Sequence, residues 1–141
     1  MMAMDLVWGL LIGLGTVVSS HVLGFDRDRS YYPTLMIIIA LAYILFAVIA
    51  VPPASLLLEG AAAAVFVGLA VAGHRWNLWL VVVALLGHGV FDLIHSRFIT
   101  NAGVPAWYAG FCSVADLILA AALAMLILRG HVARRIAAPA A

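Results

Sequence analysis

Long, predominantly apolar runs, separated by short polar breaks, make up most of the chain. The breaks are Asp26–Arg29, the pair Pro52-Pro53, His74-Arg75 and residues 96–105. The runs between them are close to the roughly 20 residues that an apolar helix needs to cross a bilayer. Two adjacent prolines cannot continue a helix, so the longest run divides there. The pattern predicts an all-α, polytopic transmembrane helix bundle in one domain, residues 1–141, with five spans at about 6–24, 32–51, 54–73, 76–95 and 106–128 and a short tail at 129–141.

The arginines divide unevenly between the two sides of this predicted bundle. Only Arg97 falls on one side; on the other are Arg27, Arg29, Arg75, Arg129, Arg134 and Arg135. Because cytoplasmic loops carry an excess of basic residues, this split predicts a cytoplasmic C-terminus and an N-terminus outside. An arrangement of four spans, in which one apolar run forms a re-entrant loop, stays open as the alternative.

Composition removes the other protein classes. Apolar residues make up 67% of the chain and charged residues 9%, where soluble domains carry about 25% charged residues. So few charges cannot cover a water-soluble surface, and the composition also excludes a disordered chain and a nucleic-acid-binding protein. Cys112 is the single cysteine, so the chain forms no internal disulfide. The main partner expected is the lipid bilayer.

Small residues follow one stripe of the predicted third span. Gly60, Ala64 and Gly68 are spaced four residues apart. Small residues let helix backbones approach closely in lipid, where packing holds helices together. We favour packing within one bundle as the role of this stripe, with the contact face of a homo-oligomer as the second interpretation.

Acidic residues occur inside the predicted spans. Glu59, Asp92 and Asp116 all fall in the outer half of the membrane or near its midplane. A charged side chain at the centre of a bilayer costs roughly 2.5–3.5 kcal/mol even on the translocon scale. We therefore expect all three to face the interior of the bundle, and we expect Glu59 to be either protonated or paired with His88 or Asp116.

The span at 76–95 carries a polar stripe. His88, Asp92 and His95 are spaced i, i+4 and i+7, which places them within roughly 60° of one another on a helix. We expect His88, Asp92 and Asp116 to meet in one cavity open to the outside, with His95 at its mouth.

These residues suit a divalent metal ion. Zn²⁺ binds imidazole nitrogens together with carboxylate oxygens, and Mn²⁺ or Fe²⁺ tolerates the same ligands. In this hypothesis the ion activates water to hydrolyse a small molecule carried in the membrane. The candidate metal ligands are His88, Asp92, His95 and Asp116, and the candidate catalytic residues are Glu59 and Asp92.

Two other functions fit the same polar residues. In a proton- or ion-coupled small transporter, Glu59, Asp92 and Asp116 would exchange protons or bind an ion in turn. In a structural or accessory membrane subunit, the polar cluster would only lock the helices together. Both alternatives stay open at the level of the sequence.

Three parts of the chain resemble a family of short bacterial integral membrane proteins that has no characterised activity. The resemblance rests on residues 24–34 (GFDRDRSYYPT), on residues 88–95 (HGVFDLIH), and on residues 101–107 (NAGVPAW) with Phe111-Cys112. It covers nearly the whole chain and implies a stand-alone protein of the bacterial inner membrane. It implies no substrate or cofactor, so it assigns a role to no residue.

Overall fold

The computed structural model describes residues 3–50 and 55–132, which form an all-α bundle without a strand. This confirms the predicted fold class, and the five helices are each long and apolar enough to cross a membrane. The elements are α1 (Ala3–Leu23), the short 3-10 helix η1 (Phe25–Arg27), α2 (Tyr31–Ile49), α3 (Leu56–Arg75), α4 (Trp79–Phe98) and α5 (Tyr108–Leu128).

The fourth helix differs from its predicted span. It runs from Trp79 to Phe98 rather than from 76 to 95. The side-chain oxygen of Asn77 accepts the backbone N–H of Trp79 at 3.1 Å, and such a bond satisfies one of the free donors at a helix start. At the other end, the Ile99 N–H donates to the His95 carbonyl at 2.9 Å, so the helix continues past His95. Pro52-Pro53, the predicted start of the third span at residue 54 and most of the predicted tail lie outside the described residues.

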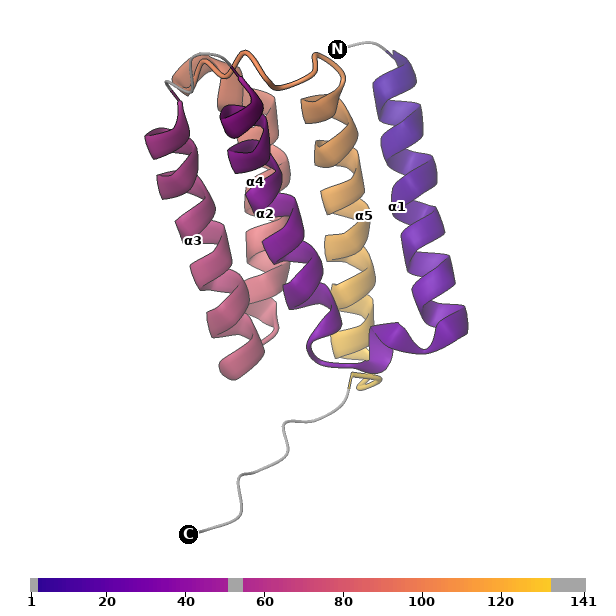
Figure 1. Ribbon diagram of the computed structural model, residues 1–141. Helices are drawn as coiled ribbons and strands as arrows, with labels where there is room; N and C mark the ends of the chain where they lie inside the picture. Colours follow the sequence, from indigo (N-terminus) through magenta and orange to yellow (C-terminus); the bar gives the residue numbers. More distant parts are fainter. Residues whose placement is uncertain (1–2, 51–54, 133–141) are drawn as a thin grey trace, which may run out of the picture.

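The helices run alternately up and down the bundle, and α5 is central to it (Figure 1). It packs against α1 on one side and α4 on the other, while α2 and α3 pack on each other and α3 continues onto α4. A large apolar core, including Met36, Leu85 and Leu123, fills one half of the bundle. The buried polar residues His88, Asp92 and His95 of α4 lie in the other half.

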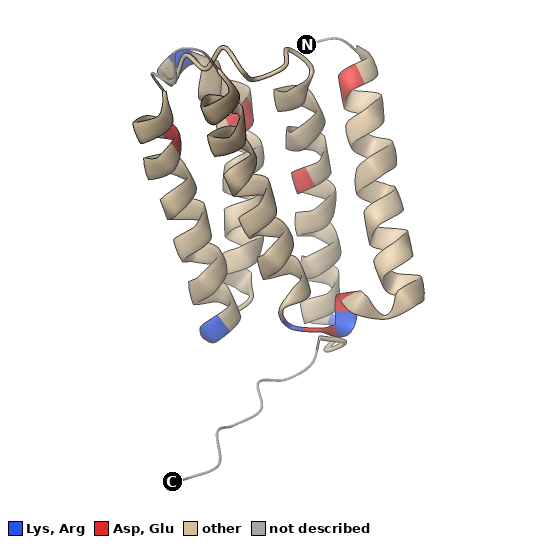
Figure 2. Ribbon diagram, viewed as in Figure 1, with Lys and Arg blue, Asp and Glu red and all other residues tan. Residues whose placement is uncertain are grey.

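The two ends of the bundle differ in charge, as Figure 2 shows. We call one the arginine-rich end: Arg27 ends η1, Arg29 precedes α2, Arg75 ends α3 and Arg129 follows α5. We call the other the Asn101 end, after the loop that joins α4 to α5; Arg97, near the end of α4, lies there. Arg134 and Arg135 are outside the described residues.

Glycines set the distance between α1 and α5. A Cβ atom at Gly9 would collide with the Phe111 carbonyl oxygen, and one at Gly13 would lie 2.9 Å from Ile118 Cδ1. By contrast, a Cβ at Gly60 or Gly68 would meet no atom within 4 Å. The interpretation of the α3 stripe as packing within the bundle is therefore wrong, because these two glycines face away from the other helices.

Candidate metal centre

The polar stripe of α4 turns into the bundle. His88 is 1% exposed, Asp92 2% and His95 4%, and on neighbouring helices Glu59 and Asp116 are 1% and 0% exposed. All five predicted site residues are thus buried away from lipid. The predicted inward orientation follows from the cost of leaving ionisable groups against acyl chains.

Three of these residues form one compact group, as predicted. His88 Nδ1 lies 2.8 Å from Asp116 Oδ2 on α5 and 3.5 Å from Asp92 Oδ2 one helical turn further along α4. One ligand atom from each side chain lies within 4.8 Å of the other two. We call His88, Asp92 and Asp116 the His-Asp-Asp group.

A glycine allows α4 and α5 to approach each other at this group. A Cβ atom at Gly89 would lie 3.2 Å from the Ser113 carbonyl oxygen and 3.4 Å from Asp116 Cβ. The first separation is shorter than an ordinary van der Waals contact, and the second is at its lower limit. A side chain larger than that of alanine at position 89 would therefore push the two helices apart. Gly89 therefore keeps Asp116 within reach of His88.

The group has unused acceptors. Asp92 Oδ1 accepts a hydrogen bond from the Tyr43 hydroxyl at 2.7 Å, but Asp92 Oδ2 and Asp116 Oδ1 have no hydrogen-bond partner among the described residues. A buried carboxylate oxygen without a partner is costly. A bound cation would satisfy both oxygens.

The spacing and charge of the group match a divalent ion. Two ligands each about 2.1 Å from Zn²⁺ in tetrahedral geometry lie about 3.4 Å apart. The separation of 3.5 Å between His88 Nδ1 and Asp92 Oδ2 is close to this value, whereas the 2.8 Å between His88 Nδ1 and Asp116 Oδ2 is a hydrogen-bond distance that would lengthen around an ion. Two carboxylates and a neutral imidazole would balance the charge of a 2+ ion. Such balance matters in a low-dielectric interior, where uncompensated charges are expensive. Three protein ligands also leave a coordination position for water, as in catalytic zinc sites.

His95 and Glu59 form a second pair outside this group. His95 Nε2 lies 2.9 Å from Glu59 Oε1, and the Asn101 side-chain amide donates to the same oxygen at 2.8 Å. Glu59 is thus buried and has polar partners, as expected, but these partners are His95 and Asn101 rather than His88 or Asp116. Seven residues advance a helix by about 10 Å, so His95 shares the face of His88 but lies two turns away, beside α3 rather than the His-Asp-Asp group.

Tyr43 of α2 connects the two polar groups. Its ring stacks on His95, with centroids 4.2 Å apart, while its hydroxyl donates to Asp92. Asn101 also bonds to the Tyr43 carbonyl, at 3.2 Å. The sequence analysis missed both Tyr43 and Asn101. Tyr43 did carry a signal, because a tyrosine in the middle of an apolar span needs a partner for its hydroxyl.

A cavity of about 370 Å³ lies at the Asn101 end, and we call it the α4–α5 cavity. Asp92, His95 and Asn101 line it together with residues of the loop and the first turn of α5. His88 and Asp116 are not among its lining residues. The expectation that all three residues of the group share one open cavity is therefore not met: Asp92 alone of the three lines the α4–α5 cavity, and His95 borders it beside the Asn101 loop.

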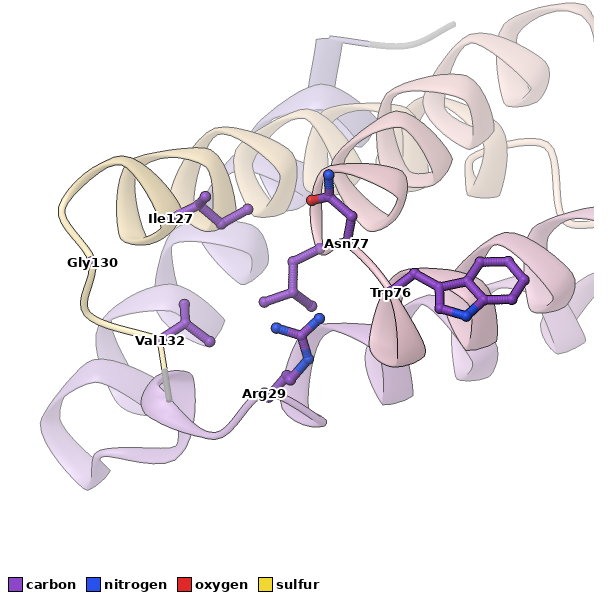
Figure 3. A pocket seen from close by; sticks show the side chains of 7 residues that line it. Arg29, Trp76, Asn77, Ile127, Gly130 and Val132 are labelled. Carbon is purple, nitrogen blue, oxygen red and sulfur yellow. The ribbon is translucent and has the colours of Figure 1, made fainter. Parts of the chain in front are cut away.

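A cavity of about 300 Å³ at the arginine-rich end has a different character (Figure 3). Arg29 is its charged residue, but the guanidinium is engaged: Nε donates to the His74 carbonyl at 2.8 Å and an Nη to the Gly73 carbonyl at 3.4 Å. These bonds satisfy free acceptors at the C-terminal end of α3. We therefore assign Arg29 a structural role.

Comparisons of the chain with protein-family models, with curated proteins and with solved structures found no match. The geometry of the buried polar residues is therefore the basis on which we infer a function.

Proposed function

We propose that this membrane protein binds a divalent metal ion, such as Zn²⁺, at the His-Asp-Asp group and uses it to hydrolyse a small molecule carried in the membrane. One observation carries the proposal: His88, Asp92 and Asp116 are buried, and one potential ligand atom from each lies within 4.8 Å of the other two. Two carboxylate oxygens of this group, Asp92 Oδ2 and Asp116 Oδ1, accept no hydrogen bond among the described residues, which supports the proposal. A bound ion would lower the pKa of its water ligand and so supply hydroxide at neutral pH.

The Glu59–His95 pair suits the role of a general base in this reaction. Glu59 holds His95 through Nε2, which leaves Nδ1 to take a proton from water. Asp92 and His95 both line the α4–α5 cavity, so substrate and water would enter there. In this scheme Glu59 orients the base, Asp92 is a metal ligand at the cavity wall, and Tyr43 fixes Asp92 by its hydrogen bond.

The position of the group favours a binding site over a transport pathway. Between Asp116 and the arginine-rich end, α5 contributes the buried apolar residues Leu119 and Leu123, and α4 contributes Leu85. Tyr32 is the one buried residue of that core with a polar side-chain atom, so this core contains no chain of polar side chains that could pass an ion or proton through this half. A structural role for the group is the second candidate, because the hydrogen bonds also hold α2, α4 and α5 together.

Metal content tests the binding step. Protein purified without a histidine tag should contain about one divalent ion per chain, and chelated protein should take up Zn²⁺ in a calorimetric titration. Substitution of a residue that only holds a metal ligand in place commonly lowers metal affinity about 10–100-fold. His88→Ala and Asp116→Asn alter a ligand itself, so each should lower the affinity at least about 100-fold. The double variant should lose no more than either single variant, because both residues share one ion. His21→Ala, at the opposite end, is the control. If wild-type protein neither contains nor takes up a divalent ion, the metal-binding proposal is wrong and the structural role of the His-Asp-Asp group is the better explanation.

Catalysis is tested separately with His95→Gln. This variant should keep the metal, since His95 lies outside the His-Asp-Asp group, but it should hydrolyse membrane-borne substrate about 10²–10⁴-fold more slowly because it lacks the base. The assay would incubate metal-loaded protein with vesicles of bacterial lipid extract and identify products by mass spectrometry. Equal turnover by His95→Gln and wild type would contradict the assigned base.

We further propose that the protein lies in a bacterial inner membrane with its N-terminus outside and its C-terminus in the cytoplasm. The concentration of arginine at one end of the bundle supports this orientation. It predicts that a cytoplasm-dependent reporter fused to the C-terminus is active and that a reporter fused at Asn101 reports the periplasm. Fusions that report the same side would contradict the five-span topology.

A further inference from the structure

A second cavity with buried polar atoms lies at the arginine-rich end, where α1, η1, α2 and α5 meet. We call it the inner cavity, and its volume is about 310 Å³. Its deeper wall is apolar: Val17, Ala122, Met125 and Leu126. Its polar lining consists of His21, Asp26, Tyr32, Arg129 and His131.

Two polar atoms of this lining have no partner. Asp26 and Tyr32 are each 2% exposed, yet neither Asp26 Oδ1 nor the Tyr32 hydroxyl has a hydrogen bond among the described residues. The other carboxylate oxygen, Asp26 Oδ2, lies 2.8 Å from His21 Nδ1. Buried polar groups in proteins are normally satisfied, so these two atoms point to a ligand that donates hydrogen bonds.

The cavity lies at the level of lipid headgroups. His21 is two residues from the end of α1, Tyr32 is the second residue of α2, and Arg129 directly follows α5. The apolar wall continues from this level into the bundle along α1 and α5. This order, polar at the helix ends and apolar deeper, is the order along a phospholipid molecule.

We propose that the inner cavity binds a phospholipid whose headgroup carries a primary amine. The ammonium group donates to Asp26 Oδ1 and to the Tyr32 hydroxyl oxygen, while Arg129 and His131 face the phosphate. The first part of an acyl chain lies on Val17 and Met125. Charge-assisted hydrogen bonds to a carboxylate are the strongest available to such a headgroup. The cavity shares no residue with the His-Asp-Asp group, so this proposal does not depend on the proposed metal.

Headgroup chemistry gives a sharp test. Delipidated protein in detergent is titrated with phosphatidylethanolamine, phosphatidylcholine and phosphatidylglycerol of identical acyl chains, and binding is followed by native mass spectrometry. The choline ammonium has no N–H to donate, and the glycerol headgroup has no cation. We expect the ethanolamine lipid to bind about tenfold more tightly than the other two, since hydrogen bonds to charged groups are the more stabilising kind. Equal binding of the three lipids overturns the proposal.

Two variants test whether Tyr32 and Asp26 are responsible for the preference for the ethanolamine lipid. Tyr32→Phe removes only a hydroxyl that has no hydrogen bond among the described residues, so it should fold normally and bind the ethanolamine lipid several-fold more weakly. Asp26→Asn should remove the preference over the choline lipid. Asp28→Asn is the matched control: Asp28 bonds to Ser30 at 2.7 Å, which holds the pKa of its carboxyl below the usual 3.8, and it does not line the cavity. A preference that persists in both Tyr32→Phe and Asp26→Asn overturns the assignment.

A soluble headgroup compound tests whether the acyl chains of the lipid are needed for binding. Glycerophosphoethanolamine carries the same phosphate and ammonium without acyl chains. It should bind far more weakly than the lipid, because it cannot cover the apolar wall of the cavity. If it competes as well as the intact lipid, the inner cavity is a site for a soluble amine and the lipid assignment is wrong.

Discussion

Removal of the Asp116 carboxylate is expected to lower the free energy of unfolding by about 3–5 kcal/mol even in metal-free protein. Asp116→Ala leaves His88 buried at 1% exposure without its 2.8 Å partner. Breaking a buried pair from one side is costly because the remaining group keeps its desolvation penalty and loses its compensation. The measurement is thermal or denaturant unfolding in detergent with a chelator present.

Changing both partners separates the cost of an orphaned group from the value of the pair. In His88→Leu/Asp116→Leu both polar groups are gone, and apolar replacements of a buried pair are often neutral or stabilising. We expect the double variant to be more stable than Asp116→Ala. Asp28→Ala, at an exposed carboxylate that bonds only to Ser30 at the start of α2, should lower the free energy of unfolding by about 1 kcal/mol, the usual cost of a lost hydrogen bond at a helix start. A loss below about 1 kcal/mol for Asp116→Ala would mean that His88 and Asp116 do not form the pair described here.

The fold could be predicted from the sequence because a long apolar segment that crosses a bilayer must satisfy its backbone hydrogen bonds internally, which a helix does. The lengths of the apolar runs predicted the bundle, and helical spacing predicted the inward face of α4. The spacing predicted His95 both at the mouth of the cavity and among the metal ligands. His95 does line the cavity, but its Nε2 pairs with Glu59 of α3. Because His95 is only three residues from Asp92 on the same face of α4, helical geometry alone does not exclude it from the His-Asp-Asp group, and the position of α3 decides its partner.

Other features of the site depend on contacts between distant parts of the chain. Tyr43 and Asp92 are 49 residues apart, and Asn101 and Glu59 are 42 residues apart. No local pattern in the sequence pairs such residues; only the packing of α2, α3 and the Asn101 loop around α4 does. The start of α4 was a local feature that could have been found, since Asn77 is a favoured residue next to a helix start.

Glycine-to-leucine substitutions should separate the packing of α1 from the integrity of the candidate metal centre. Gly9→Leu places a side chain against the Phe111 carbonyl of α5, and overpacking of this kind typically costs about 1–3 kcal/mol. The loss matters for α1 in particular, because close packing rather than hydrophobicity holds helices together in lipid. Gly15→Leu is the matched control on the same helix, since a Cβ at Gly15 would meet no atom within 4 Å.

Gly89→Leu should have the larger effect, because it acts at the contact that brings α4 to α5. Its side chain would enter the space beside Ser113 and Asp116, so the two helices must separate and His88 must lose its partner. We therefore expect Gly89→Leu to lose both stability and Zn²⁺ binding, whereas Gly9→Leu should lose stability but still bind Zn²⁺ below its unfolding temperature. The reason is that α1 supplies no residue to the His-Asp-Asp group. Calorimetric titration and thermal unfolding of the same preparations measure both quantities, and normal Zn²⁺ affinity in Gly89→Leu would show that the ion does not depend on the approach of α4 to α5.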